Sequence, residues 1–154
     1  MNLTNLFNEQ LIFFVESEKK ENTIKEIVRD LKKMKIIKKE DKILKKIFER
    51  EQLGSTGIGK GIAIPHCKVK DIKKSIVAIG ISRKGVDFNS NDHNLTHLIV
   101  LVISPIDKPT QHLQILASAA HLAKKVFPII NKLINLKTKT EVYKFLRELE
   151  QDNG

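Results

Sequence analysis

The chain is poor in cysteine, aromatic residues and long apolar segments, and each shortage excludes a class of protein. Its 154 residues include one cysteine and no tryptophan, and aromatic residues make up 5%. One cysteine excludes an intrachain disulfide, and few aromatics argue against base-stacking nucleic-acid binding. No apolar run approaches the ~20 residues of a membrane span, and the N-terminus lacks a signal segment. We therefore expect a cytoplasmic protein that neither inserts into a membrane nor binds nucleic acid.

The residues that are abundant indicate one core with a basic surface. Hydrophobic residues make up 41% and charged residues 30% of the chain, as in ordinary soluble proteins. No linker divides the sequence, so we expect a single domain over residues 1–154. Lysine and arginine number 28 against 18 acidic residues, a net charge of +10. This excess favours an acidic or phosphate-bearing partner, or is only a coat of solvated lysines.

Apolar patterning predicts an α/β fold in which strands alternate with helices. Two patterns of the form Thr-x-x-Glu, at Thr23 and at Thr138, are typical of a capping box at the start of a helix. A glycine at position 54 follows the second helix as a C-cap would. The expected strands are 11–15, 75–82 and 97–104, and the expected helices begin near 23, 41, 110 and 138.

The segment GSTGIGKGIAIPHCK, residues 54–68, is the most informative part of the sequence. Glycines allow backbone N–H groups to converge without a Cβ in the way, and such groups form a cradle for phosphate. His66, which follows Pro65, is a nucleophile that is largely uncharged near neutral pH. The pattern predicts a phosphoryl group carried on His66. The expected phosphate-binding residues are Gly54, Ser55, Thr56, Gly57 and Gly59.

The same segment imitates a nucleotide-binding loop without being one. Gly54, Gly59 and Lys60 match the first seven positions of a Walker A motif, but Gly61 stands where that motif has Ser or Thr. The residues after it include Pro65 and cannot open a helix, as a Walker A loop requires. We therefore expect no nucleotide and no other cofactor.

Among the remaining histidines, His112 is the one expected to point into the protein. At 100° per residue it shares a helix face with Leu116 and Ala119, in the first turn, where free N–H groups favour an anion. The alternative is a core histidine bonded to a carbonyl. His121 lies on the opposite, polar face. His93 and His97 lack further ligands for zinc, so no metal site is expected.

Three basic residues flank the proposed site. Arg50 ends the helix before the glycine segment and is placed to clamp a phosphate, although a helix-end cation favoured by the dipole is the other interpretation. Lys60 and Lys68 bracket His66 and are the expected docking residues for an anionic partner.

The segment REQLGSTGIGKGIAIPHCK resembles the enzyme IIA domain of the fructose–mannitol class of the bacterial phosphotransferase system, closest to its nitrogen-regulatory branch. The resemblance continues into PTQHLQILA. It implies a mixed sheet of about five strands flanked by helices. It also implies that His66 accepts a phosphoryl group from HPr or a related carrier, beside His112 and Arg50. His97 and Cys67 depart from the family pattern.

The resemblance leaves the role of the carrier open. A regulatory enzyme IIA that acts by binding target proteins is the first expectation. A sugar-transport enzyme IIA that passes the phosphoryl group to a separate IIB domain is the alternative. A binding module with a vestigial histidine is a further one, and the intact set of His66, His112 and Arg50 argues against it.

Overall fold

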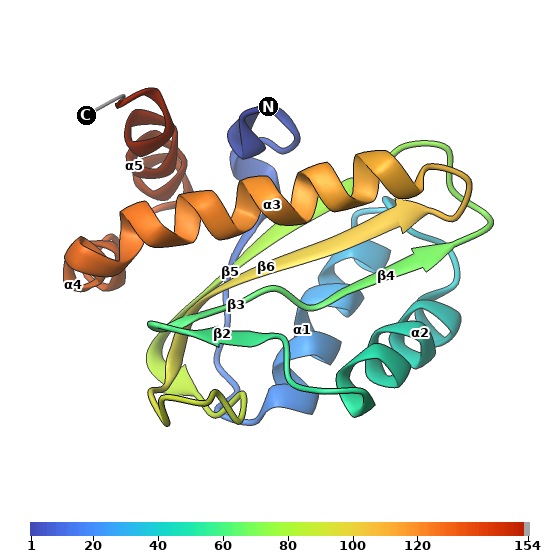
Figure 1. Cartoon of the computed structure of the whole chain (residues 1–154), viewed down its shortest axis with the longest axis horizontal. Helices are drawn as coiled ribbons and strands as arrows, with labels where there is room; N and C mark the ends of the chain where they lie inside the picture. Colours follow the sequence, from blue (N-terminus) through green and yellow to red (C-terminus); the bar gives the residue numbers. More distant parts are fainter. Residues whose placement is uncertain (153–154) are drawn as a thin grey trace.

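A six-stranded mixed sheet forms the centre of the molecule in the computed structural model, which describes residues 1–152 (Figure 1). The strand order is β1-β5-β6-β3-β2, and β4 also pairs with β6. β5 and β6 are antiparallel, whereas β1 runs parallel to β5, and β3 and β4 run parallel to β6. The strands are β1 (Ile12–Phe14), β2 (Gly57–Gly59), β3 (Ile62–Ala63), β4 (His66–Val69), β5 (Ile76–Val86) and β6 (Thr96–Pro105).

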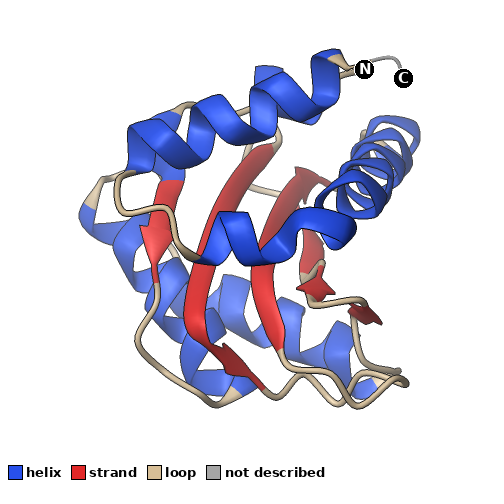
Figure 2. Cartoon of the chain, turned by 90° about the vertical axis from the view of Figure 1, so that its left-hand side faces the viewer, coloured by secondary structure: helices blue, strands red, loops and turns tan. Residues whose placement is uncertain are grey.

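Helices cover both faces of this sheet (Figures 1 and 2). The first two long helices lie on one face and the later ones on the other. The α-helices are α1 (Lys20–Lys33), α2 (Glu40–Gln52), α3 (Pro109–Val126), α4 (Ile130–Ile134) and α5 (Lys139–Gln151). Short 3-10 turns are η1 (Leu3–Asn5), η2 (Glu9–Leu11) and η3 (Phe127–Ile129).

Side chains of β6 alternate between the two cores. Leu98, Val100 and Val102 pack in the cluster that contains the inner faces of α3 and α5. Ile99, Leu101 and Ile103 pack in the cluster that contains α1 and α2. This two-residue period explains why the strand is apolar along nearly its whole length, since both of its faces are buried.

The residues around Pro65 form an interrupted strand along one side of β6. β3 pairs with Leu98 and Ile99, and β4 pairs with residues from Val102 onward. Between them the carbonyl of Pro65 accepts from the N–H of Val102 at 3.0 Å. The missing N–H of proline thus falls where the strand is interrupted, and β4 resumes beside β6 with His66 as its first residue.

The predicted α/β class, a sheet of about five strands flanked by helices, is confirmed, with six strands found. The expected strands and long helices are all present, and Thr138 with Glu141 forms the expected capping box. β5 is longer than the expected strand 75–82 and runs to Val86.

The capping box predicted at Thr23 is wrong. α1 begins earlier, at Lys20, and no side chain caps it. Lys19 is extended and pairs with Asp87, so the helix starts directly after this bridge. Thr23 then lies in the first turn, and its hydroxyl donates to the carbonyl of Lys19 at 2.8 Å. Glu26 accepts from backbone N–H groups that precede the helix.

One segment, Pro109–Ile134, is long and apolar enough to cross a membrane, judged by its length and by a mean hydropathy of 1.2 over an 18-residue window, 28% of which is buried. Core helices of soluble proteins meet the same test. In this fold α3 packs one face against the sheet, with His112, Ile115, Ala119, Leu122, Ala123 and Val126 buried.

Candidate functional site

His66 lies half-buried on β4, at an edge of the sheet. Its partner on β6 is Val102, which packs under α3, so the imidazole faces α3 as well. Nδ1 of His66 lies 2.8 Å from the carbonyl oxygen of Ile64. A carbonyl only accepts, so Nδ1 carries the ring proton and donates it. Nε2 therefore keeps its lone pair.

Burial and several neighbouring groups affect the pKa of His66, and their net effect lowers this pKa below the ordinary value of 6.5. Burial of the ring is the largest cause, because desolvation disfavours the charged form. The carbonyl of Ile64 raises the pKa, whereas the guanidinium of Arg50 lowers it. The ring is consequently neutral at physiological pH, as a nucleophile must be.

His112 lies in the first turn of α3 and is buried, with 4% of its surface exposed. The centroids of the His66 and His112 rings are 5.4 Å apart and the rings are tilted by 57°. Nδ1 of His112 contacts the hydroxyl of Ser104 at 2.7 Å. Burial, with the nearby His66 and Lys68, lowers the pKa of His112 to about 4. The two histidines are thus neutral neighbours.

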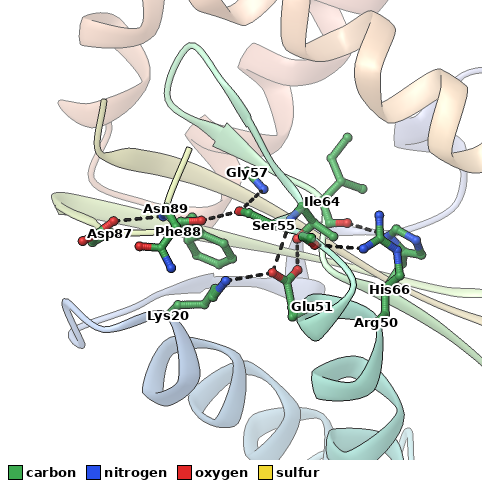
Figure 3. A network of polar contacts seen from close by, with 12 residues as sticks. Lys20, Arg50, Glu51, Ser55, Gly57, Ile64, His66, Asp87, Phe88 and Asn89 are labelled. Carbon is green, nitrogen blue, oxygen red and sulfur yellow. Dashed lines mark hydrogen bonds and ion pairs between the residues drawn. The ribbon is translucent and has the colours of Figure 1, made fainter. Parts of the chain in front are cut away.

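Arg50, in the last turn of α2, reaches the same place from the other face of the sheet (Figure 3). Its Nη1 donates to the carbonyl of Gly54 at 2.9 Å. Arg50, His66 and His112 line one open pocket of about 510 Å³, with Lys68 beside them. Exposed apolar side chains form the rim of this pocket: Leu53, Ile106 and Leu113.

The glycine segment, which the sequence predicts to cradle a phosphate, uses three of its backbone N–H groups inside the protein. The N–H groups of Gly54, Thr56 and Gly57 donate to the Glu51 carbonyl, the Glu51 carboxylate and the Ser55 hydroxyl. The Ser55 hydroxyl itself donates to a backbone carbonyl. These groups are engaged within the protein, and none of these residues lines the His66 pocket. The physical reason is that residues after Thr56 enter the sheet as β2.

The far end of this segment is a turn, and its residues lie apart from His66. Gly59 has φ +82°, a left-handed conformation that suits glycine, and it ends β2. The N–H of Lys60 donates to Asp92, and its ammonium lies 5.5 Å from the centroid of the Phe127 ring. Of the two expected docking lysines, only Lys68 lines the pocket of His66.

Glu51 is a residue of the site region that sequence reasoning missed. It is buried and accepts from the Lys20 ammonium at 3.0 Å, the Thr56 N–H at 3.2 Å and the Thr56 hydroxyl (Figure 3). A glutamate in the last turn of a helix opposes the dipole. That unfavourable placement beside Arg50 was the signal that could have identified it. It anchors the glycine segment to α1 and α2.

Ser104 is a second residue that sequence reasoning missed, and no feature of the sequence signals its role. It is fully buried near the end of β6, and only the packing of α3 on the sheet brings it to His112. His97 lies elsewhere, with its Nδ1 2.7 Å from the carbonyl of Ser82, and His121 is exposed. Within residues 1–152, no three His, Cys, Asp or Glu side chains gather as a potential metal site.

Solved structures of other proteins share this architecture. Nitrogen regulatory protein IIA-Ntr from Neisseria meningitidis has a TM-score of 0.80 and 26% identity, over 94% of this chain and 98% of that one. IIA mannitol from Escherichia coli matches with a TM-score of 0.76 over 91% of this chain and 98% of that one, at 23% identity. The fold is therefore that of the enzyme IIA proteins, which are components of a phosphotransferase system.

The family follows from the sequence match. The model described as "Phosphoenolpyruvate-dependent sugar phosphotransferase system, EIIA 2" matches residues 5–149. The chain belongs to this family, and the resemblance noted from residues 50–68 is confirmed.

Curated relatives carry two kinds of name. A fructose-specific EIIA component of Haloferax volcanii is 34% identical, over 71% of this chain and 70% of that protein. A nitrogen regulatory protein of Klebsiella oxytoca is 28% identical, over 99% of this chain and 94% of that protein. The fructose-specific EIIABC component of Bacillus subtilis is 35% identical over 79% of this chain, but the match spans only 19% of that protein.

Proposed function

We propose that the protein is a phosphohistidine carrier that accepts a phosphoryl group on Nε2 of His66 from an HPr-like carrier protein. The observation that carries this proposal is the contact of Nδ1 with the Ile64 carbonyl at 2.8 Å. It directs the lone pair to Nε2, in a pocket shared with Arg50 and His112. The lowered pKa of His66 supports the same role, because only the neutral ring is nucleophilic.

The step exchanges one P–N bond for another. The lone pair on Nε2 of His66 forms the new bond to phosphorus, while the donor's P–N bond breaks and its electrons return to the donor imidazole. The Nδ1 proton of His66 stays in place, and the Ile64 carbonyl stabilises the positive charge that the ring gains. Arg50 and His112 stabilise the phosphoryl oxygens. This exchange needs neither a nucleotide nor a metal.

Docking of the carrier uses the pocket rim. Leu53 and Leu113 are 84% and 66% exposed, and they supply apolar contact area beside Lys68 and Arg50. A phosphorylated partner brings negative charge to this basic site, so complementary charge speeds its approach. Lys60 lies on a different part of the surface, outside the proposed docking site.

We infer a regulatory role first, in which the output is binding to target proteins. The match to a nitrogen regulatory protein over nearly the whole length of both chains supports it. The alternative, transfer to a separate fructose- or mannitol-type IIB domain, draws support from the fructose-specific relatives, which share higher identity. We propose a cytoplasmic location and a single enzyme IIA unit over residues 1–154. The one cysteine supports this location.

The test is incubation with phosphoenolpyruvate, enzyme I and HPr, followed by intact-mass measurement. We expect one added phosphoryl group that is lost in acid, as phosphohistidine is. His66→Ala removes the added mass, whereas His121→Ala, an exposed histidine on the same protein, keeps it. Labelling that persists in His66→Ala refutes the proposal. Loss of the adduct on addition of a IIB domain favours transport, and a stable adduct favours regulation.

A further inference from the structure

A chain of polar side chains contacts Nδ1 of His112 from within the fold. Ser104, fully buried on β6, places its Oγ 2.7 Å from Nδ1. Ser75, just before β5, lies with its Oγ 3.4 Å from that of Ser104 and 3.0 Å from Oε1 of Gln111. Ser104, Ser75 and Gln111 thus form one connected set of polar side chains, and Ser104 is the member that contacts the ring.

Counting protons decides between the two forms of the neutral ring. His112 carries a single ring proton at neutral pH, because its pKa is lowered to about 4. The 2.7 Å contact is a normal hydrogen bond, whereas 3.4 Å is beyond the usual O–H···O range. If Nδ1 donated, the buried hydroxyl proton of Ser104 would have only the long contact to Ser75, which is unfavourable. The better arrangement has Ser104 donating to Nδ1.

We propose that Ser104 is a positioning residue, which donates to Nδ1 of His112 and thereby holds the ring proton on Nε2. The proposal rests on the proposed function, since a phosphoryl group on His66 is what the Nε2–H would bind. Nε2 of His112 makes no hydrogen bond to other groups within residues 1–152, and the ring lines the His66 pocket. A neutral N–H there donates to a phosphoryl oxygen, whereas the opposite tautomer would present a lone pair and repel it.

The direct test is ¹⁵N NMR of the histidine rings in the unphosphorylated wild-type protein at neutral pH. The unprotonated and protonated nitrogens of a neutral imidazole resonate far apart, so the tautomer can be assigned. We expect Nδ1 of His112 unprotonated and Nε2 protonated. The reverse assignment overturns the proposal. This spectrum needs no phosphoryl donor, so its outcome is independent of whether His66 accepts a phosphoryl group.

Variants extend the test to the phosphorylated protein. Ser104→Ala removes the donor, and we expect mixed tautomers and hydrolysis of the adduct about tenfold faster. Ser75→Ala is the matched control, because it removes a neighbouring hydroxyl that does not touch His112, and it should keep the wild-type tautomer. Ser104→Thr keeps a hydroxyl and should restore the adduct lifetime. Wild-type tautomer and lifetime in a folded Ser104→Ala contradict the proposal. If Ser104→Ala does not fold, the wild-type spectrum still decides.

Discussion

Replacing Glu51 by glutamine tests whether its carboxylate holds the site region together. Both members of its ion pair are withdrawn from water, with the side chains of Lys20 and Glu51 11% and 5% exposed. The same carboxylate accepts from the N–H and the hydroxyl of Thr56. Glu51→Gln keeps the shape and one carbonyl oxygen, but it leaves the Lys20 ammonium without its counter-charge.

The expected loss is large because the pair is buried. Removing one partner of a buried ion pair costs about 3–5 kcal/mol, since the remaining charge stays desolvated. Glutamine retains an acceptor for Thr56, so we expect about 3 kcal/mol, at the lower end of this range. The matched control is Asp71→Asn, which breaks ion pairs to Lys39 and Lys42 that are 44–63% exposed. Solvent screens those pairs, and we expect little or no loss.

The assay is urea unfolding of both variants against wild type, followed by circular dichroism. A double-mutant cycle with Lys20→Met separates the pair from the contacts of Glu51 with Thr56. We expect Lys20→Met to recover much of the stability lost in Glu51→Gln, because the uncompensated charge is then gone. If Glu51→Gln is no less stable than Asp71→Asn, the argument from burial is refuted.

Three further predictions concern phosphoryl transfer. Arg50→Lys keeps the charge but loses the planar guanidinium group, so the rate of phosphoryl transfer to His66 should fall about tenfold when labelling is quenched at set times. An unchanged rate would remove Arg50 from the site. With excess phosphoryl donor, the rate of His66 labelling should stay level from about pH 8 to pH 6.5 and decline only below pH 6.5. Burial lowers the pKa of His66, and protonation below that pKa occupies the Nε2 lone pair. A decline centred above pH 6.5 contradicts this prediction. Lys68→Ala should flatten the salt dependence of labelling whereas Lys60→Ala should not, and equal slopes for the two variants would exclude charge-guided docking at the pocket.

The Thr-x-x-Glu pattern predicted the start of one helix correctly and failed at another, where pairing with a distant residue fixed the start of the helix. Thr138 with Glu141 forms the expected capping box at the start of α5. The identical pattern at Thr23 does not, because Lys19 pairs with Asp87 and starts α1 earlier. That bridge joins residues far apart in the chain, and no local pattern contains it.

The glycine segment shows a second limit of sequence reasoning. Its composition predicted converging amides, and the glycines do supply a left-handed turn, at Gly59. Whether the amides are free depends on Glu51, whose carboxylate is turned toward Thr56 by its ion pair with Lys20. These amide N–H groups donate to acceptors on α2 and within the segment itself. Only the folded structure therefore determines whether they are free to bind a phosphate.

By itself, the sequence determined which histidines face the interior. The period of α3 turns His112 toward the sheet and leaves His121 on its exposed side. Only the tertiary structure decided that the rings meet at 5.4 Å, that Arg50 joins them from the opposite face, and that Ser104 lies against Nδ1. Periodicity specifies the side of an element on which a residue lies, but not which other element covers that side. The register of β4 on β6 and the packing of α3 and α2 around this edge supply that information.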